Sequence, residues 1–450
     1  MIEQTKSKDP FEQPVDRYLD HFKAFESALN GESKLPIHQL RREAMERFRN
    51  VGFPTTRHEE WRFTNVSSVA KADFRPVIAP EQAGVSSADV ARLSYGEGHL
   101  LVFVNGHFAK DLSLVRSLPA GVVCGSLAAA FLSRDPLVQK LFGTLAVSAD
   151  SPFVYLNTAF VRDGAYIAVP DGVVMKESIH VLYIASTEDA ALISLRNLIV
   201  LGQNAECSIV ESYSSLKNGR YLTNAVTEIF ASDGSVLEHD KLQNEALGAF
   251  HVAMIQARLG RGARCTSNSI ALGGSIVRNN VAVLLDDQGG ECTLNGLSLG
   301  TGDQLLDNHT TIDHAKPNCS SHELYKSILD GTSRGVFNGK IFVRPQAQKT
   351  DAKQTNKTLL LSDGATIDTK PQLEIFADDV KCTHGATVGQ LDAEQVFYLR
   401  TRGIDESAAR DILTFAFASD VVRRVHVEPL RIRLEALIRQ RLDEGRKQGA

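Results

Sequence analysis

A thiol and an imidazole stand two residues apart in the segment Lys381-Cys382-Thr383-His384-Gly385, where a long β-rich region gives way to helical patterns. If this segment is extended, Cys382 and His384 project from the same face, because side chains alternate with a period of two along a strand. Thiolate and neutral imidazole are both ligands for iron, zinc and Cu(I). The pair supplies half of a coordination sphere. The alternative is a packing segment, with a buried Cys382 and with His384 bonded to the backbone.

A second group of candidate ligands consists of His309, His314, Cys319 and His322. Three imidazoles and a thiol so close together could bind zinc. Their spacing matches no compact zinc template, however, and in a strand His309 and His314 fall on opposite faces. This pattern favours residues that alternate between the surface and the core.

The elements that position these residues are predicted to be strands. Short runs rich in Val, Ile and Leu, broken by Gly, Asn and Asp, fill residues 150–385. A turn motif recurs among them, and the small apolar residue that follows it stands 27 or 29 residues from the next. The resulting series is Cys207, Val236, Cys265, Cys292 and Cys319.

A period near 28 residues predicts a β-solenoid, in which equivalent corners stack coil upon coil. We therefore expect the four cysteines of the series to form a buried, inert ladder. The competing architecture is a β-sandwich or closed barrel, which would need tight two-residue turns in place of the longer Gly-rich corners. A parallel β-helix has open ends, which must be capped or paired with another chain.

Helical patterns flank this region. We predict a mainly β protein with three parts: a mostly helical N-terminal domain at 1–150, a parallel β-helix core at 151–388 and a C-terminal helical domain at 389–450. Residues 56–59 have the form of a capping box before Trp61, which we expect to be a packing anchor. A helix starting at Pro429 carries a leucine-rich stripe that could pack on a neighbouring element or bind a partner.

Composition narrows the function. The chain has 450 residues and a net charge of -5, so it has no global basic field for nucleic acid or an anionic membrane. No apolar run reaches the ~18 residues that span a bilayer, and no secretory pattern opens the chain. Six cysteines without paired spacing suit a reducing compartment. We expect a cytoplasmic protein.

No enzyme signature stands out. The segment 334–341 is the nearest match to a phosphate-binding loop, but it lacks the first Gly and the final hydroxyl. No Gly-x-Ser-x-Gly elbow appears, and no dinucleotide-binding Gly motif follows a strand. We expect no catalytic activity from this chain.

Several longer motifs resemble the SufB/SufD family of iron–sulfur cluster assembly proteins. They are Val-Phe-Asn-Gly at 336–339, Lys-Thr-Asp at 349–351, Asp-Thr-Lys-Pro-Gln-Leu-Glu-Ile at 368–375, the run at 378–389 and Gln-Val-Phe-Tyr-Leu-Arg-Thr-Arg-Gly-Ile at 395–404. The run Glu-Glu-Trp-Arg-Phe-Thr at 59–64 and the Cys-x-His segment resemble the SufD branch of this family more than the SufB branch.

The resemblance implies a right-handed parallel β-helix between helical terminal domains. It also implies two partners: a SufB-like paralogue bound through the end of the β-helix, and a SufC-like ABC-type ATPase held by the C-terminal helices. His384 corresponds to the functional histidine of the family, and Cys382 to its interfacial cysteine. Together with a partner cysteine they would hold a transient iron–sulfur cluster on a non-catalytic scaffold.

Other possibilities stay open at this point. The chain could be a purely structural scaffold that contributes no ligand, or a β-helix enzyme acting on carbohydrate, which would need a groove lined with acids. It could form a homodimer when alone. A reduced flavin is a further candidate cofactor at the level of the assembled complex.

Overall fold

The computed structural model describes residues 12–79, 84–96, 98–146 and 151–449. The domain boundary expected at residue 150 lies outside these ranges. The helices are α1 (Glu12–Ala28), α2 (Ile37–Val51), α3 (Ser67–Lys71), α4 (Ser87–Leu93), α5 (Leu127–Ser133), α6 (Pro136–Leu141), α7 (Pro152–Phe160), α8 (Ala393–Thr401), α9 (Glu406–Val422) and α10 (Glu428–Gly449), with 3₁₀ turns η1 (Asn30–Lys34), η2 (Glu59–Trp61) and η3 (Lys110–Leu112).

The strands are β1 (Arg75–Pro76), β2 (His99–Val104), β3 (His107–Phe108), β4 (Val123–Ser126), β5 (Ala165–Val169), β6 (Ile179–Ala185), β7 (Ala191–Leu201), β8 (Glu206–Ser215), β9 (Leu222–Ala231), β10 (Val236–Asn244), β11 (Phe250–Leu259), β12 (Arg264–Ala271), β13 (Ile276–Leu285), β14 (Glu291–Gly300), β15 (Leu305–His314), β16 (Ser320–Leu329), β17 (Arg334–Val343), β18 (Asp351–Leu360), β19 (Thr366–Ile375) and β20 (Lys381–Gly389).

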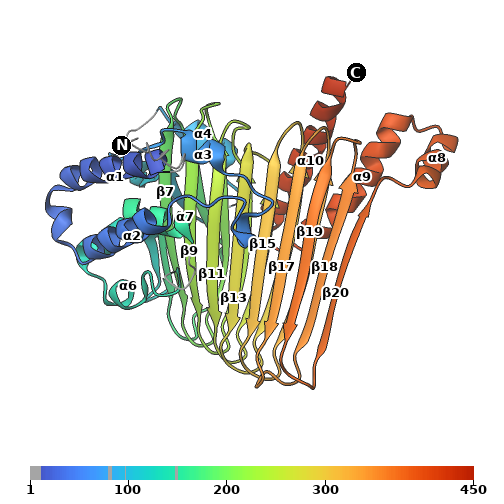
Figure 1. The fold of residues 1–450 in the computed structure, drawn as a ribbon. Helices are drawn as coiled ribbons and strands as arrows, with labels where there is room; N and C mark the ends of the chain where they lie inside the picture. Colours follow the sequence, from blue (N-terminus) through green and yellow to red (C-terminus); the bar gives the residue numbers. More distant parts are fainter. Residues whose placement is uncertain (1–11, 80–83, 97, 147–150, 450) are drawn as a thin grey trace, which may run out of the picture.

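These strands form a parallel β-solenoid with helices at both ends of the chain, which confirms the predicted fold class (Figure 1). Odd-numbered strands from β5 to β19 stack in one sheet, called sheet A here, and even-numbered strands from β6 to β20 stack in the other, sheet B. We call the interior between the sheets the lumen. Because both faces of most strands are covered, they are near-continuous runs of buried residues.

The recurring turn motif is explained by backbone geometry. Asn204, Gly234, Gly262 and Gly289 all have positive φ values, from 53° to 73°, and occupy equivalent corners of successive coils. A residue with a branched side chain would be strained in this left-handed region, whereas Gly and Asn tolerate it. The corners therefore repeat because each coil must turn in the same way as its neighbour.

The predicted cysteine series was wrong at two of its five positions. Strand pairing aligns Cys207 with Leu237, not with Val236, and aligns Cys292 with Ser321, not with Cys319. The lumen-facing column is therefore Cys207, Leu237, Cys265, Cys292, Ser321, Ala352 and Cys382. Coil length varies, from 27 residues between Cys265 and Cys292 to 31 between Ser321 and Ala352, so a fixed period loses the phase. The thiols of Cys207, Cys265 and Cys292 are buried, as expected.

The N-terminal helices cap the first coils. Aromatic side chains of α1, α2 and α7, among them Phe25, Phe48 and Phe160, pack on the outer face of sheet A. Trp61 is buried in the same cluster, as predicted. The expected capping box at 56–59 is wrong, because η2 follows His58 without a side-chain cap and Thr55 contacts the His58 ring instead.

The C-terminal helices lie along the outer face of sheet B. Leu430, Leu434 and Ile438 of α10 are buried against strand residues such as Leu242 and Leu297. Each such side chain contributes about 1.5 to 3 kcal/mol on burial, so the leucine-rich stripe packs on the chain's own sheet. Helix α8 stands apart, beyond the last coil (Figure 1). No helix of the described residues is long and apolar enough to cross a bilayer.

Candidate functional site at the open end of the solenoid

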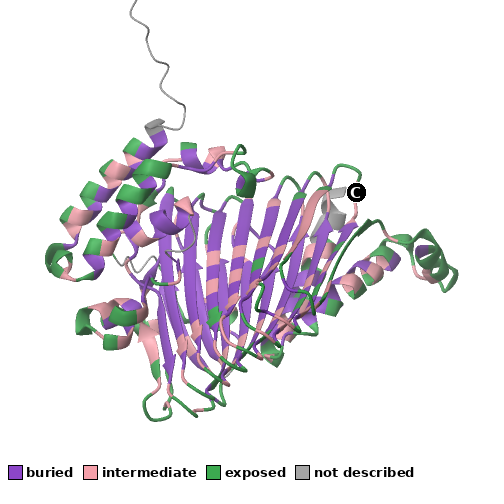
Figure 2. Ribbon diagram, turned by 60° about the horizontal axis from the view of Figure 1, so that its bottom comes forward, coloured by how far each residue is buried: buried purple, intermediate pink, exposed green. Residues whose placement is uncertain are grey.

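Among the strands that the structure describes, none pairs with the outer side of the last coil, which consists of β19 and β20. Burial falls toward this end, and β20 is exposed along almost its whole length (Figure 2). Because Lys381 N–H donates to Thr350 O, the odd-numbered residues of β20 bond inward to β18, and the backbone groups of its even-numbered residues face outward. The solenoid therefore ends in an unpaired edge.

Cys382 and His384 lie on this edge strand. They pair in register with Ala352 and Gln354 of β18, so both side chains stand on the lumen side of the last coil. Cys382 is half-buried, and burial raises the pKa of its thiol. His384 is exposed. The structure thus brings the two predicted ligands together on one face, at the rim of the lumen.

Deeper in the lumen lies a closed charged network. Glu211 contacts His239 at 3.1 Å, and Lys241 contacts His251 at 2.9 Å and Asn279 at 2.6 Å. His239 and Lys241 hold the pKa of Glu211 at about 2 despite its burial, and desolvation lowers the pKa of Lys241 to about 8. Buried charges that satisfy one another in this way fix the shape of the core.

The cysteine column does not connect this interior to the rim. Ser321 and Ala352 stand between Cys292 and Cys382, which are three strands and therefore roughly 14 Å apart. Burial also raises the pKa of Cys207 and of Cys265 to about 12, so these thiols are poor nucleophiles. Cys382 thus differs from the inner thiols in two ways: it is only half-buried, and it lies at the rim, away from them.

Two family models match the chain: "SUF system FeS cluster assembly, SufBD core domain" over residues 183–417 and "SufBD protein N-terminal region" over residues 12–181. The chain belongs to the SufBD family. It is 32% identical to the iron–sulfur cluster assembly protein SufD of Escherichia coli over 88% of this chain and 90% of that protein. The SufBD family protein slr0076 of Synechocystis sp. is 30% identical over 94% and 95%, and the SufD protein of Bacillus subtilis is 26% identical over 90% and 94%.

This SufBD-family chain also carries residues beneath the rim that sequence inspection missed. Glu323 and Gln354 stack in register with His384 on β16, β18 and β20. Burial raises the pKa of Glu323 to about 7, in contrast to the paired Glu211. The signal that could have found them is the strand register, because Glu323, Gln354 and His384 follow one another at intervals of one coil.

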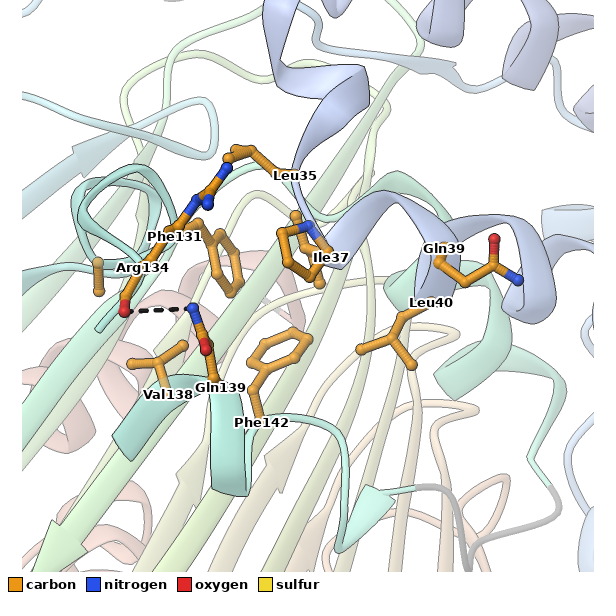
Figure 3. Close-up of a pocket in the computed structure, with 11 residues that line it drawn as sticks. Leu35, Ile37, Gln39, Leu40, Phe131, Arg134, Val138, Gln139 and Phe142 are labelled. Carbon is orange, nitrogen blue, oxygen red and sulfur yellow. Dashed lines mark hydrogen bonds between the residues drawn. The ribbon is translucent and has the colours of Figure 1, made fainter. Parts of the chain in front are cut away.

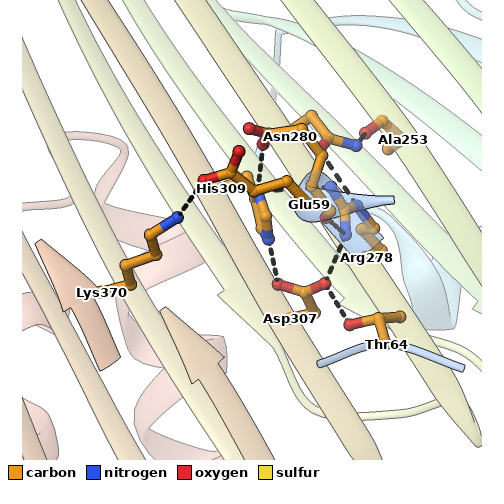
Figure 4. Close-up of polar contacts among 9 residues, drawn as sticks. Glu59, Thr64, Ala253, Arg278, Asn280, Asp307, His309 and Lys370 are labelled. Atoms are coloured by element: carbon orange, nitrogen blue, oxygen red, sulfur yellow. Dashed lines mark hydrogen bonds and ion pairs between the residues drawn. The ribbon is translucent and has the colours of Figure 1, made fainter. Parts of the chain in front are cut away.

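The second candidate ligand group does not assemble. His309 is on the outer face of β15, where it contacts Asp307 at 3.1 Å and Glu60 at 3.3 Å (Figure 4). His314 faces the lumen and contacts Ser321, while the thiol of Cys319 donates to Asp287 O. Within the described ranges, no group of three or more His, Cys, Asp or Glu residues could hold a metal ion.

Two of the surface hollows have volumes of about 480 and 450 Å³. One, of about 480 Å³, lies between α2, α5 and α6 and is mainly apolar, with Phe131 and Phe142 among its lining residues (Figure 3). The other runs over the outer face of sheet A, and its carboxylates are paired: Glu60 with His309, and Asp313 with Arg344. Neither hollow presents the pair of free carboxylates that glycoside hydrolysis requires.

Proposed function

We propose that this SufBD-family protein is a non-catalytic scaffold subunit that contributes Cys382 and His384 to a transient site of iron–sulfur cluster assembly. The observation that carries the proposal is the placement of a thiol and an imidazole on one face of an unpaired edge strand. A thiolate and an imidazole suit iron, and two ligands leave the remaining coordination positions to a second subunit. The iron and sulfide of the cluster are the cargo of this site.

A SufB-like paralogue is the partner that would close the edge. The outward-facing backbone groups of β20 can pair with a strand of another chain, and exposed apolar side chains lie beside them. Phe376 is 58% exposed and Val388 is 45% exposed. An unpaired edge with apolar neighbours favours association. A cysteine from the paralogue could then join Cys382 and His384 across the seam.

A SufC-like ABC ATPase would dock on the surface that the C-terminal helices leave open. The leucine stripe of α10 is covered by sheet B, whereas Phe397 and Tyr398 of α8 are 65% and 57% exposed. Helix α9 is tied to β16 by the buried Lys326, which contacts Asp420 at 2.8 Å. Nucleotide-driven closure of two ATPase subunits would pull on these helices and shift the seam between open and closed states.

Replacing Cys382 and His384 by Ala, singly and together, tests the proposed ligands. We expect each single variant to reduce the cluster yield of the purified complex several-fold and the double variant to abolish it, with assembly of the complex unchanged. Thr383→Ala is the matched control, because this residue lies between them and its side chain points away from the lumen. A full cluster yield from the double variant would favour the purely structural scaffold instead.

A further inference from the structure

A column of three polar side chains runs from the lumen to the rim. Glu323 and Gln354 are 3% and 2% exposed and lie directly beneath His384 in register. The Gln354 Nε2 group donates a hydrogen bond of 2.6 Å to Glu323 Oε2. Neighbouring strands are about 4.8 Å apart, and the register places Gln354 between Glu323 on one side and His384 on the other.

The amide oxygen of this column has no hydrogen-bond partner among the described residues. Gln354 Oε1 is buried without a hydrogen bond, whereas the Thr310 hydroxyl lies close enough to the Glu323 carboxylate across the lumen to lower its pKa by hydrogen bonding. Buried polar atoms are almost always satisfied, by protein or by water. The space for the amide is provided by Gly339, where a Cβ atom would overlap the Gln354 side chain. The chain thus holds an oriented amide with its acceptor oxygen unused.

A ligating histidine needs such an acceptor. When one ring nitrogen binds a metal, the other usually donates its N–H to a carboxylate or carbonyl group, which fixes the tautomer and the ring orientation. We propose that the lumen-facing ring N–H of His384 donates to Gln354 Oε1, and that Glu323 fixes the direction of this amide and thereby selects the His384 tautomer. Glu323 and Gln354 are positioning residues, and the inference rests on the proposed function of His384 as a ligand.

The column can also respond to pH. Ionised Glu323 accepts from the Gln354 N–H, which leaves Oε1 for the imidazole. When Glu323 takes up a proton from solvent, its O–H can donate to Gln354 Oε1, and the amide turns to present N–H toward His384. The facing ring nitrogen must then accept, which requires the other tautomer. The pKa of about 7 for Glu323 places this change near neutral pH.

The surroundings of Glu323 leave its charge uncompensated. Among the groups on adjacent lumen positions, Cys292 of β14 and Tyr325 of β16 are titratable, and burial raises the pKa of both, so they are neutral. Gln354 of β18 and Thr310 of β15 are uncharged. Within the described residues no Lys, Arg or His pairs with Glu323, unlike Glu211 deeper in the lumen.

The tautomer of His384 can be measured on the full, metal-free chain by long-range ¹H–¹⁵N correlation with labelled histidine, and the signal is assigned by its loss in His384→Asn. We expect one tautomer to be favoured about tenfold at pH 8.5 in the wild type, as a single hydrogen bond can supply, and the ratio to change as pH falls through 7. In Glu323→Gln and Gln354→Met we expect a ratio near one that no longer depends on Glu323 titration.

Thr358→Val is the matched control. Thr358 is a buried lumen residue of β18 with an unpartnered hydroxyl, but it lies outside the column, so its removal should leave the His384 tautomer unchanged. Thermal unfolding identifies any variant that fails to fold, and Glu323→Gln and Gln354→Met each test the inference alone. An unaltered tautomer ratio in either folded variant would overturn it. Cluster yield is measured separately, so failure of His384 as a ligand is distinguishable from failure of the column.

Discussion

At the residue scale, the lumen contains two kinds of buried acid with opposite behaviour. Glu211 is surrounded by His239, Lys241 and the Tyr213 hydroxyl, and these groups hold its pKa at about 2. Glu323 has only the Gln354 amide and the Thr310 hydroxyl as polar partners, and burial raises its pKa to about 7. Burial alone favours the neutral form, and a nearby cation reverses this. Glu211, in the first coils, therefore stays ionised at neutral pH, whereas Glu323, near the rim, can gain or lose a proton there.

Replacing Glu211 by Gln tests the charged network. The folded pKa of about 2 lies below the ordinary value of 4.5, so the stabilisation from ionised Glu211 is complete above the ordinary pKa and is lost as pH falls toward 2. We expect E211Q to lose about 3 to 5 kcal/mol at pH 7, because Lys241 keeps its buried charge without this partner. The free energy of unfolding, measured by denaturant titration at a series of pH values from 7 to 2, should also decline less steeply with falling pH in E211Q than in the wild type.

Glu188→Gln is the control, because Glu188 pairs with Lys217 on the surface with its side chain 80% exposed. Its loss should change stability by less than about 1 kcal/mol at any pH. Equal acid sensitivity of E211Q and the wild type would show that Glu211 does not carry this part of the pH dependence.

At the element scale, a strap formed by residues 57–66 ties the N-terminal cap to sheet A. The Arg278 guanidinium lies 3.8 Å from the Trp61 ring centre and donates to Glu60 O at 2.7 Å. It also donates to Asp307 at 2.8 Å (Figure 4). Thr64 of the strap also donates to Asp307. Further along, Glu59 contacts Lys370 of β19 at 2.7 Å. The strap thus joins the cap to the last coil.

Arg278→Met should release this strap. It removes one of the two cationic partners of the buried Asp307 and leaves His309 as the other, so we expect a loss of about 3 kcal/mol and faster tryptic cleavage at Arg57 and Arg62. Lys370→Met removes a pair whose Glu59 side chain is 74% exposed, and should cost less than about 1 kcal/mol. Comparable cleavage rates in the two variants would contradict the dominant role given to Arg278.

The proposed ATPase-docking surface can be tested on α8. Phe397→Ser and Tyr398→Ser remove exposed apolar area without disturbing the core, so we expect the fold to persist and the retention of the ATPase in a pull-down to fall at least tenfold for the pair. Ile432→Ser, on α10 and 61% exposed, is a control of similar exposure on another helix. Undiminished retention by the α8 variants would place the docking surface elsewhere.

Sequence patterns predicted the elements better than their register. The turn motif predicted the solenoid because left-handed corners favour Gly or Asn, and helical patterns predicted the helices at both ends of the chain, including α10, which begins one residue before Pro429. The strands align Leu237, not Val236, with the cysteines because coil length varies at corners of different size. Cys382 and His384 could be placed on one face from the sequence because they are two residues apart on the same strand. Gln354 and Glu323 lie one and two coils away, so placing them beside His384 requires the register between coils, which the sequence did not provide.

At the scale of the whole molecule, α1, α2 and α7 cover the outer face of sheet A over the first coils, and the solenoid is open at the end formed by β19 and β20. At the open end, β20 contains no proline that would hinder pairing with a strand of another chain, whereas β19 contains Pro371. Thr366 and Phe376 N–H groups bond inward to residues in or before β17, so the odd-numbered positions of β19, including Pro371, face outward. Proline there removes one outward donor without weakening the sheet.

The same logic predicts a variant that blocks assembly. Ala386→Pro would remove an outward N–H from β20 and leave its bonds to β18 intact, so we expect the monomer to fold and its association with the SufB-like paralogue to fall at least tenfold by size-exclusion chromatography. Thr387→Pro removes an inward donor and should destabilise the last coil instead. Normal association of a folded A386P chain would argue against pairing through β20.

The order of synthesis gives the open end a further significance. A ribosome releases the cap first, and each new coil then finds a finished template on which to stack. Strand β20 is laid down after all the other strands that the structure describes. A nascent chain therefore presents Cys382 and His384 to another subunit only after every earlier coil has been synthesised.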